Sequence, residues 1–210
     1  RWYTGCGVYR HVYLSKSTDV RVAEWGVQAI SEVKKGVGHV TLNTQIENFS
    51  GRSRRVTVRQ KLWNKARQLV MQTSKTCDVA VSGTTVKQQM RVPKPQLWSP
   101  ASPNLYTITT EIIENGRVLD GDTIRMGMRT VAFDAKQGFF LNGKNMKING
   151  VCLHGDLGCL GAAINEDALY RQVSMMKAMG ANAIRCSHNP PAPELLNLCD
   201  SLGMLVVDEA

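Results

Sequence analysis

The sequence has no long apolar run and no closely spaced cysteine pair. No segment approaches the roughly 18 uninterrupted apolar residues of a membrane-spanning helix, so we expect no membrane partner. The 6 cysteines form no Cys-x-x-Cys pair, and the 4 histidines include no two that lie four residues apart. We therefore expect no zinc site built from neighbouring residues, predict no structural metal, and interpret the cysteines as buried, free thiols.

Acidic residues are scarce, since 26 Lys and Arg outnumber 17 Asp and Glu and give a net charge of +9. The interval from Arg52 to Lys94 contains Asp78 as its single acid among many basic residues. Such a cluster can bind nucleic acid or an acidic glycan. However, apolar and polar residues alternate from Val56 to Leu62, which is typical of a strand with one buried and one solvated face. We interpret the charge as a solvated basic face and expect no nucleic-acid partner.

The length of 210 residues, with 43% hydrophobic and 20% charged residues, favours a globular chain of two domains. From about Val20 to Met128 the apolar residues alternate over short stretches, and Asn115-Gly116 is typical of a hairpin turn. The expected strands contain Val40 to Ile46, Val56 to Val58, Val79 to Val81, Val86 to Val92 and Tyr106 to Ile112. The pattern predicts a β-sandwich of immunoglobulin type over residues 19–128.

The pattern changes in residues 129–210. Phe139 to Ile148 predicts a hairpin through Asn142-Gly143, after which strands and helices alternate. The strands are expected at Lys147 to Leu153, Ala183 to Ser187 and Met204 to Val207. The first helix is expected to begin after Asn165 and to end at Gly180, and the second to begin at Pro193. This order is βαβαβ, the start of an α/β fold.

Polar side chains follow each of the three expected parallel strands. The carboxyl ends of parallel strands meet at one edge of a sheet, and in a (β/α)8 barrel that edge forms the active site. We therefore predict one active-site wall formed by His154, Asp156, Arg185, His188, Asn189, Asp208 and Glu209.

The same stretches resemble glycoside hydrolase family 2. Asn182-Ala-Ile-Arg-Cys-Ser-His188-Asn-Pro and the later Asp208-Glu209 match its first catalytic-domain signature, and Gly150-Val-Cys-Leu-His154 matches its first barrel strand. Leu97-Trp-Ser-Pro and Gly127-Met-Arg-Thr130 resemble elements of its immunoglobulin-like domain. The resemblance implies a multidomain β plus α/β protein, in which an immunoglobulin-like β-sandwich precedes the first βα units of a truncated TIM barrel.

Residues 1–18 resemble the last strand of the jelly-roll sugar-binding domain that precedes the sandwich in this family, followed by a linker. Trp2, Gly5-Cys-Gly7 and Val8-Tyr-Arg10 carry this likeness. We therefore expect the chain to begin inside a longer protein and to stop inside its barrel domain, which spans residues 129–210.

For function, the resemblance implies a retaining, exo-acting glycosidase that uses two glutamates, an acid/base and a nucleophile. Both would lie beyond Ala210, so we expect this chain alone to be inactive. Arg185 would orient the nucleophile, and His154, Asp156, His188, Asn189 and Asp208 would contact the substrate. Glu209 would take neither glutamate role.

Asn189-Pro-Pro-Ala-Pro-Glu194 and Asp208-Glu-Ala210 look most like a bacterial β-galactosidase. A β-glucuronidase or β-mannosidase remains an alternative, as does a non-catalytic carbohydrate-binding or structural sandwich module. Gly155 departs from the family pattern, in which another polar residue is common. The expected partner of the parent is a β-galactoside or another β-linked oligosaccharide. Assembly into a homo-oligomer is left open. No cofactor is expected in this chain, and a divalent metal in the parent stays open. The location is also left open, between the cytoplasm and the periplasm of a bacterium.

Overall fold

The computed structural model describes residues 7–209, which divide into two compact units. The β-sandwich unit consists of Ser15–Leu97 and Asn104–Thr130. The α/β unit takes the described part of the chain up to Leu14, the loop Trp98–Pro103, and the chain from Val131 onward. In residues 7–209 no helix has the length and apolar character needed to cross a membrane.

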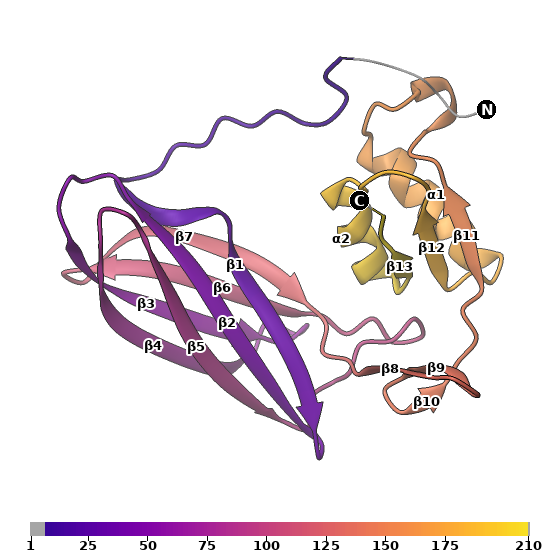
Figure 1. Cartoon of the computed structure of the whole chain (residues 1–210), viewed down its shortest axis with the longest axis horizontal. Helices are drawn as coiled ribbons and strands as arrows, with labels where there is room; N and C mark the ends of the chain where they lie inside the picture. The colour runs from indigo at the N-terminus through magenta and orange to yellow at the C-terminus, as the bar shows by residue number, and fades with distance from the viewer. Residues whose placement is uncertain (1–6, 210) are drawn as a thin grey trace. The chain divides into compact units, whose positions relative to one another are not determined.

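The β-sandwich unit contains seven antiparallel strands in two sheets (Figure 1), which confirms the immunoglobulin-type sandwich. One sheet has the order β1-β2-β5 and the other the order β4-β3-β6-β7. The strands are β1 (Val20–Lys34), β2 (Val37–Asn48), β3 (Arg54–Trp63), β4 (Leu69–Val79), β5 (Thr84–Pro93), β6 (Tyr106–Glu114) and β7 (Arg117–Met126).

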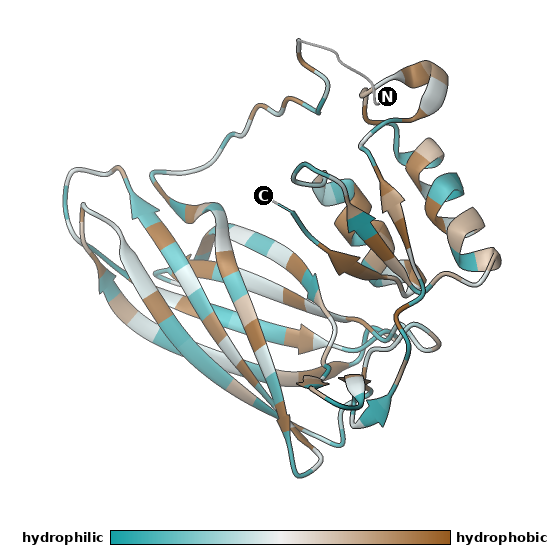
Figure 2. Ribbon diagram, turned by 45° about the vertical axis from the view of Figure 1, so that its right-hand side comes forward, coloured by the Kyte–Doolittle hydropathy of each residue, from teal (hydrophilic) through white to brown (hydrophobic). Residues whose placement is uncertain are grey.

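Apolar and polar residues alternate along these strands, and the apolar ones form the sandwich core. Figure 2 shows hydrophobic and hydrophilic residues following one another along the strands. Val56, Val58 and Leu62 of β3 are buried, as predicted. Asn115 and Gly116 join β6 to β7 with φ angles of 50° and 78°, the positive values that a type I′ turn requires.

One predicted strand position is wrong. Val81 lies in the turn after β4, where its side chain is 53% exposed, because that strand ends at Val79. The tight turn that leads to Gly83 reverses the chain, since the Gly83 amide donates to the Ala80 carbonyl at 2.9 Å.

The basic side chains of β3 point away from the core, as predicted, and acidic residues of other strands pair with several of them. Arg54 pairs with Glu114, while Arg59 and Lys61 lie 2.7 and 3.5 Å from Glu111. Acidic residues of β6 therefore neutralise part of the basic face of β3.

The α/β unit begins with a small antiparallel sheet formed by β8 (Val131–Asp134), β9 (Gly138–Leu141) and β10 (Lys144–Asn145). The turn at Asn142-Gly143 joins the last two of these strands, as predicted. A parallel sheet of order β11-β12-β13 follows, with α1 and α2 as crossovers (Figure 1). Its elements are β11 (Gly150–Leu153), the short 3-10 helix η1 (Gly158–Leu160), α1 (Glu166–Ala178), β12 (Ala183–Cys186), α2 (Pro193–Leu202) and β13 (Leu205–Val207).

Local sequence sets the helix ends. The Asn165 side chain accepts a hydrogen bond from the Ala168 amide at 2.9 Å, and Gly180 follows the helix with φ 97°. Pro193 occupies the first turn of α2, and Gly203 ends that helix in the left-handed region. These features confirm the predicted βαβαβ order, although each of the three parallel strands is shorter than expected at one of its ends.

Residues 8–14 were expected to form a strand, and in the structure they form none. A strand requires a neighbouring strand for its hydrogen bonds, and in the described part of the chain no strand forms a ladder with residues 8–14. The other residues of the jelly-roll likeness, Trp2 and Gly5-Cys6, lie outside the described residues.

Candidate active site at the carboxyl edge of the parallel sheet

The pleat of the parallel sheet separates two sets of side chains. Cys152 of β11 pairs in register with Arg185 of β12, which pairs with Val207 of β13, so these three share one face. Cys186 belongs to the opposite face, where it is buried in the apolar core formed with the helices. The sequence therefore directs the arginine away from the helices.

Three polar side chains meet at the carboxyl edge of the Arg185 face. The Arg185 Nη2 lies 2.5 Å from Glu209 Oε1, and His188 Nδ1 lies 2.9 Å from Glu209 Oε2. One carboxylate thus joins the arginine and the histidine. We call Arg185, His188 and Glu209 the rim cluster.

The charges of the rim cluster support one another. Desolvation raises the pKa of Glu209, but the hydrogen bond from His188 and the charge of Arg185 outweigh it and bring that pKa below its ordinary value. The contact with Cys152 and the charge of Glu209 raise the pKa of Arg185. The arrangement presents a fixed cation and an oriented imidazole at the sheet edge.

His154 and Asn189 lie beside the rim cluster. The rings of His154 and His188 are edge to face with centroids 6.0 Å apart. Gly155 has φ 70°, and a Cβ there would meet the amide atoms of Asn189 at 3.1 and 3.2 Å. Gly155, the departure from the family pattern, therefore permits the close approach of the Asn189 side chain.

The remaining predicted carboxylates do not join the rim cluster. Asp208 precedes Glu209 on the chain and acts on the buried Cys186, whose pKa is raised by burial and then by this charge. Asp156 lines a pocket of about 420 Å³, which His154 and Asn189 also line. The structure thus brings together Arg185, His188, His154 and Asn189, and shows no contact of Asp156 or Asp208 with Arg185 or His188 among the interactions of the described residues.

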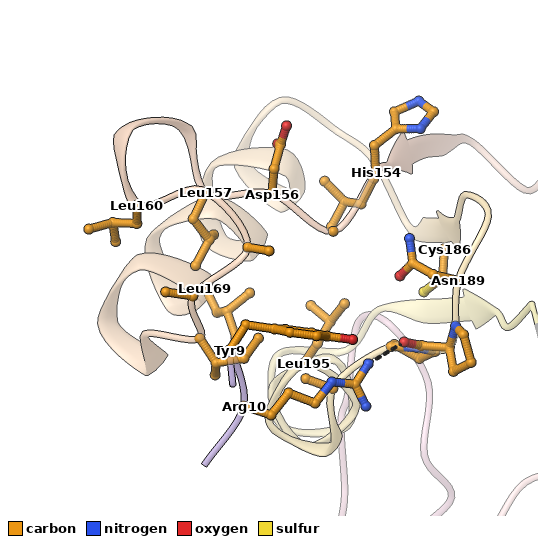
Figure 3. Close-up of a pocket in the computed structure, with 18 of the residues that line it drawn as sticks. Tyr9, Arg10, His154, Asp156, Leu157, Leu160, Leu169, Cys186, Asn189 and Leu195 are labelled. Carbon is orange, nitrogen blue, oxygen red and sulfur yellow. Dashed lines mark hydrogen bonds between the residues drawn. The ribbon is translucent and has the colours of Figure 1, made fainter. Parts of the chain in front are cut away.

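That pocket lies behind the sheet edge, on the side of the helices. Leu153, Cys186, Leu169 and Leu195 line it, together with Tyr9 from the segment before the sandwich. Figure 3 shows the Tyr9 ring among these apolar side chains. This pocket was not predicted from the sequence, because Tyr9 comes from a remote segment.

The cysteines of residues 7–209 are free, as predicted, but not all are buried. Cys186 and Cys199 are buried, whereas Cys152 and Cys159 are exposed and Cys77 is intermediate. The prediction of burial is wrong for Cys152 and Cys159. The alternation of β11 turns the Cys152 thiol to the Arg185 face, and Cys159 lies in the short 3-10 helix η1, which has no buried residue. Across residues 7–209, no group of three His, Cys, Asp or Glu side chains is arranged to hold a metal ion.

Glu209 was predicted to lie on the active-site wall, but its contacts with both Arg185 and His188 were not predicted. The parallel register of β12 and β13, which are distant in sequence and joined through α2, sets this contact rather than a local motif.

The fold and these residues agree with comparisons to known proteins. Residues 20–129 match the profile of Glycosyl hydrolases family 2, and residues 133–210 match that of Glycosyl hydrolases family 2, TIM barrel domain. The chain is 45% identical over its whole length to Beta-galactosidase BoGH2A of Bacteroides ovatus, of which it covers 25%. It is 35% identical over its whole length to a Putative beta-glucuronidase of Formosa agariphila, of which it covers 20%.

Solved structures agree as well. A glycosyl hydrolase family 2 member from Bacteroides cellulosilyticus superposes over the whole chain with a TM-score of 0.95 and 37% identity, and the chain covers 29% of it. The chain thus spans about a quarter of the length of these relatives. With both of its units matched, the chain belongs to glycosyl hydrolase family 2.

Proposed function

We propose that this chain is part of a longer bacterial protein that hydrolyses β-galactosides with retention of configuration. The rim cluster is the observation that supports the proposal most directly, since it presents a cation and an imidazole at the sheet edge that forms active sites in barrels. The 45% identity to a β-galactosidase supports the choice of sugar.

In this proposal His188 and His154 contact sugar hydroxyl groups. Donors held at such positions stabilise the reaction when their hydrogen bonds strengthen as the ring approaches an oxocarbenium ion. Asn189, Asp156 and Asp208 would complete the substrate contacts. Asp156 lines the pocket behind the edge, and the charge of Asp208 acts on Cys186. These two carboxylates would therefore contact the sugar only if the substrate or a later segment of the barrel extends to them.

Arg185 would hold the nucleophilic carboxylate supplied by a later barrel strand. In this chain its guanidinium already binds one carboxylate, Glu209, through Nη2. A guanidinium offers five N–H donors, so it can bind a second carboxylate beside the first. In this proposal Glu209 orients Arg185 and His188, and it is neither the acid/base nor the nucleophile.

The two catalytic glutamates would be about 5 to 5.5 Å apart, as retaining glycosidases require. They would come from sequence after Ala210. We expect the 210-residue chain to release no nitrophenol from 4-nitrophenyl β-galactoside, because acid/base and nucleophilic assistance would both be missing. Turnover by the purified chain that tracks the protein through purification would contradict this.

A β-glucuronidase is the second candidate, because the Formosa agariphila relative carries that name at 35% identity. The full-length protein should be tested with 4-nitrophenyl β-galactoside, β-glucuronide and β-mannoside. A kcat/KM highest for the galactoside supports the proposal, and a preference for the glucuronide supports the alternative. Proton NMR of the first-formed sugar tests retention, and an inverted product would refute the mechanism.

His188→Ala tests the site in the full-length protein. We expect kcat/KM to fall on the order of 100-fold, as for loss of a donor that acts in the transition state. His39→Ala, on β2 of the sandwich, is the control. His11 would be a poor control, because its Nε2 lies 3.8 Å from Glu194 in the first turn of α2. Equal effects of His188→Ala and His39→Ala would contradict the site assignment.

A further inference from the structure

Residues 8–11 cross the α/β unit beside both loops of the candidate site. The Ile164 amide, at the end of the loop that follows His154, donates to the Tyr9 carbonyl at 3.0 Å. The Arg10 Nη2 donates to the Pro190 carbonyl at 2.6 Å, and Figure 3 marks this bond with a dashed line. We call residues 8–11 the strap.

The loop that Arg10 reaches has few backbone donors of its own. Pro190 and Pro191 carry no N–H, and residues 189–192 belong to no helix or strand. A charged donor bound to a carbonyl gives a stronger hydrogen bond than a neutral one. The bond therefore fixes the position of Pro190, which is two residues after His188.

Neighbouring contacts fix the guanidinium in turn. It lies over the Tyr9 ring, 5.6 Å from the centroid, and His11 approaches Glu194 at 3.8 Å on the next element. The strap is thus attached to the loop before α1, to the Pro190 loop and to the start of α2. A displacement of the Pro190 loop would have to break the Arg10 bond.

We propose that Arg10 is a positioning residue, which holds the Pro190 loop so that His188 and Asn189 keep their places at the sheet edge. The inference rests on the proposed function. Arg10 itself touches neither Arg185 nor Glu209 in the described contacts, so its effect on the reaction would pass through the loop.

The test uses the full-length protein with Arg10→Gln, Arg10→Lys and, as the control, Arg117→Gln, which changes an exposed arginine at the start of β7. We expect Arg10→Gln to lower kcat by about 10- to 100-fold with little change in KM, because a small misplacement of a reacting constellation costs that much. Arg10→Lys keeps a charged donor and should recover part of the loss. The melting temperature should match that of Arg117→Gln.

A double-mutant cycle separates positioning from general stability. If Arg10 acts through His188, Arg10→Gln should have little further effect on kcat in the His188→Ala background. A full additive loss, or a loss matched by a lower melting temperature, would overturn the proposal, and so would an Arg10→Gln variant as active as Arg117→Gln.

Hydrogen exchange keeps the inference separate from the proposed function. In the 210-residue chain, Arg10→Gln should speed exchange of the Ser187 and Leu195 amides on either side of the Pro190 loop, which donate to the Leu153 and Ala192 carbonyls, whereas Arg117→Gln should not. If the full-length protein proves to have another activity but this exchange changes as expected, the anchoring role stands and only the proposed function fails. Unchanged exchange overturns the anchoring role itself.

Discussion

The indole Nε1 of Trp98 donates a hydrogen bond to the carbonyl oxygen of Asp200 at 2.8 Å, across 102 positions of sequence. Trp98 is only 1% exposed, and its own carbonyl accepts from Asn142 Nδ2 at 2.9 Å. The Pro-rich loop that follows the fifth strand of the sandwich therefore carries an aromatic anchor for the last turns of α2.

Trp98→Ala should destabilise the α/β unit by about 3–5 kcal/mol, the usual cost of removing a buried aromatic side chain. Hydrogen exchange of α2 should accelerate while that of the sandwich strands stays the same. Trp25→Ala, which removes an exposed aromatic side chain, is the control. Equal exchange rates in α2 for the two variants would show that Trp98 is no anchor.

A buried glutamine joins the two sheets of the sandwich. The Gln60 amide nitrogen donates to the hydroxyl groups of Thr44 and Thr110 at 3.0 Å each, and Gln88 donates to the Gln60 oxygen at 2.8 Å. Gln60→Met should cost about 2–4 kcal/mol in the free energy of unfolding, because several buried polar groups lose partners. Chemical denaturation measures it, with the exposed Gln72→Met as the control; a loss under about 0.5 kcal/mol would contradict the network's importance.

Lys177 of α1 caps the end of α2. Its ammonium group donates to the Pro100 carbonyl at 2.7 Å, to the Gly203 carbonyl at 3.3 Å and to that of Leu202. Lys177→Met keeps the aliphatic length but removes the donors, and should cost about 1–3 kcal/mol. Thermal denaturation against Lys144→Met, an exposed substitution on β10, gives the comparison, and a stabilised Lys177→Met protein would show that burial of the charge outweighs its hydrogen bonds.

Glu111 should make sandwich stability depend on acid. The hydrogen bond from Arg59 lowers the pKa of Glu111, against a smaller effect of burial, and the charge of Lys61 adds to it. The pKa is lower in the folded state, so the contribution is full above the ordinary glutamate value of about 4.3 and is lost as the pH falls through the folded value. Denaturation of wild type and Glu111→Gln should therefore differ most above about pH 5 and converge in acid. A difference that grows as the pH falls would contradict this sign.

Cys152 should be the most reactive described thiol at low pH. The Ser187 hydroxyl and then Arg185 lower its pKa, whereas burial raises the pKa of Cys199 to about 12. A disulfide reagent should modify Cys152 in the native chain at pH values where Cys199 does not react, with mass spectrometry locating the adduct. The fastest phase of the modification reaction should be absent in Cys152→Ala. If that phase remains in the variant, the assignment to Cys152 is wrong.

Local signals predicted much of the fold. Helix ends are set locally by the side chain or backbone angles of Asn165, Gly180 and Pro193, and a turn is set by Asn115-Gly116. These features could be predicted because none of them depends on a contact with a distant segment. The strands that alternate strongly were found for the same reason. The start of β4 at Leu69 was missed, because most of its side chains face outward and few are apolar. Strand β1 was missed as well, because a register shift between Val22 and Val27 interrupts its alternation.

Contacts between distant segments could not be predicted in this way. The meeting of Glu209 with Arg185 and His188 depends on strand register, and the Arg10 bond to Pro190 depends on a segment 180 positions away. The placement of Trp98 has the same origin. The residues themselves were recognised in the sequence, but the groups that they contact were not. The packing of whole helices and strands decides which distant groups come into contact.

The loop Trp98–Pro103 leaves the sandwich, joins the α/β unit and returns, so the two units are interleaved along the sequence. No single cut yields both of them intact. A gene segment starting at residue 131 would encode the parallel sheet without its tryptophan, and one ending at residue 130 would expose that tryptophan on the sandwich product. Recombination that exchanges this barrel for another must therefore preserve a compatible loop inside the neighbouring module, which couples the evolution of the two.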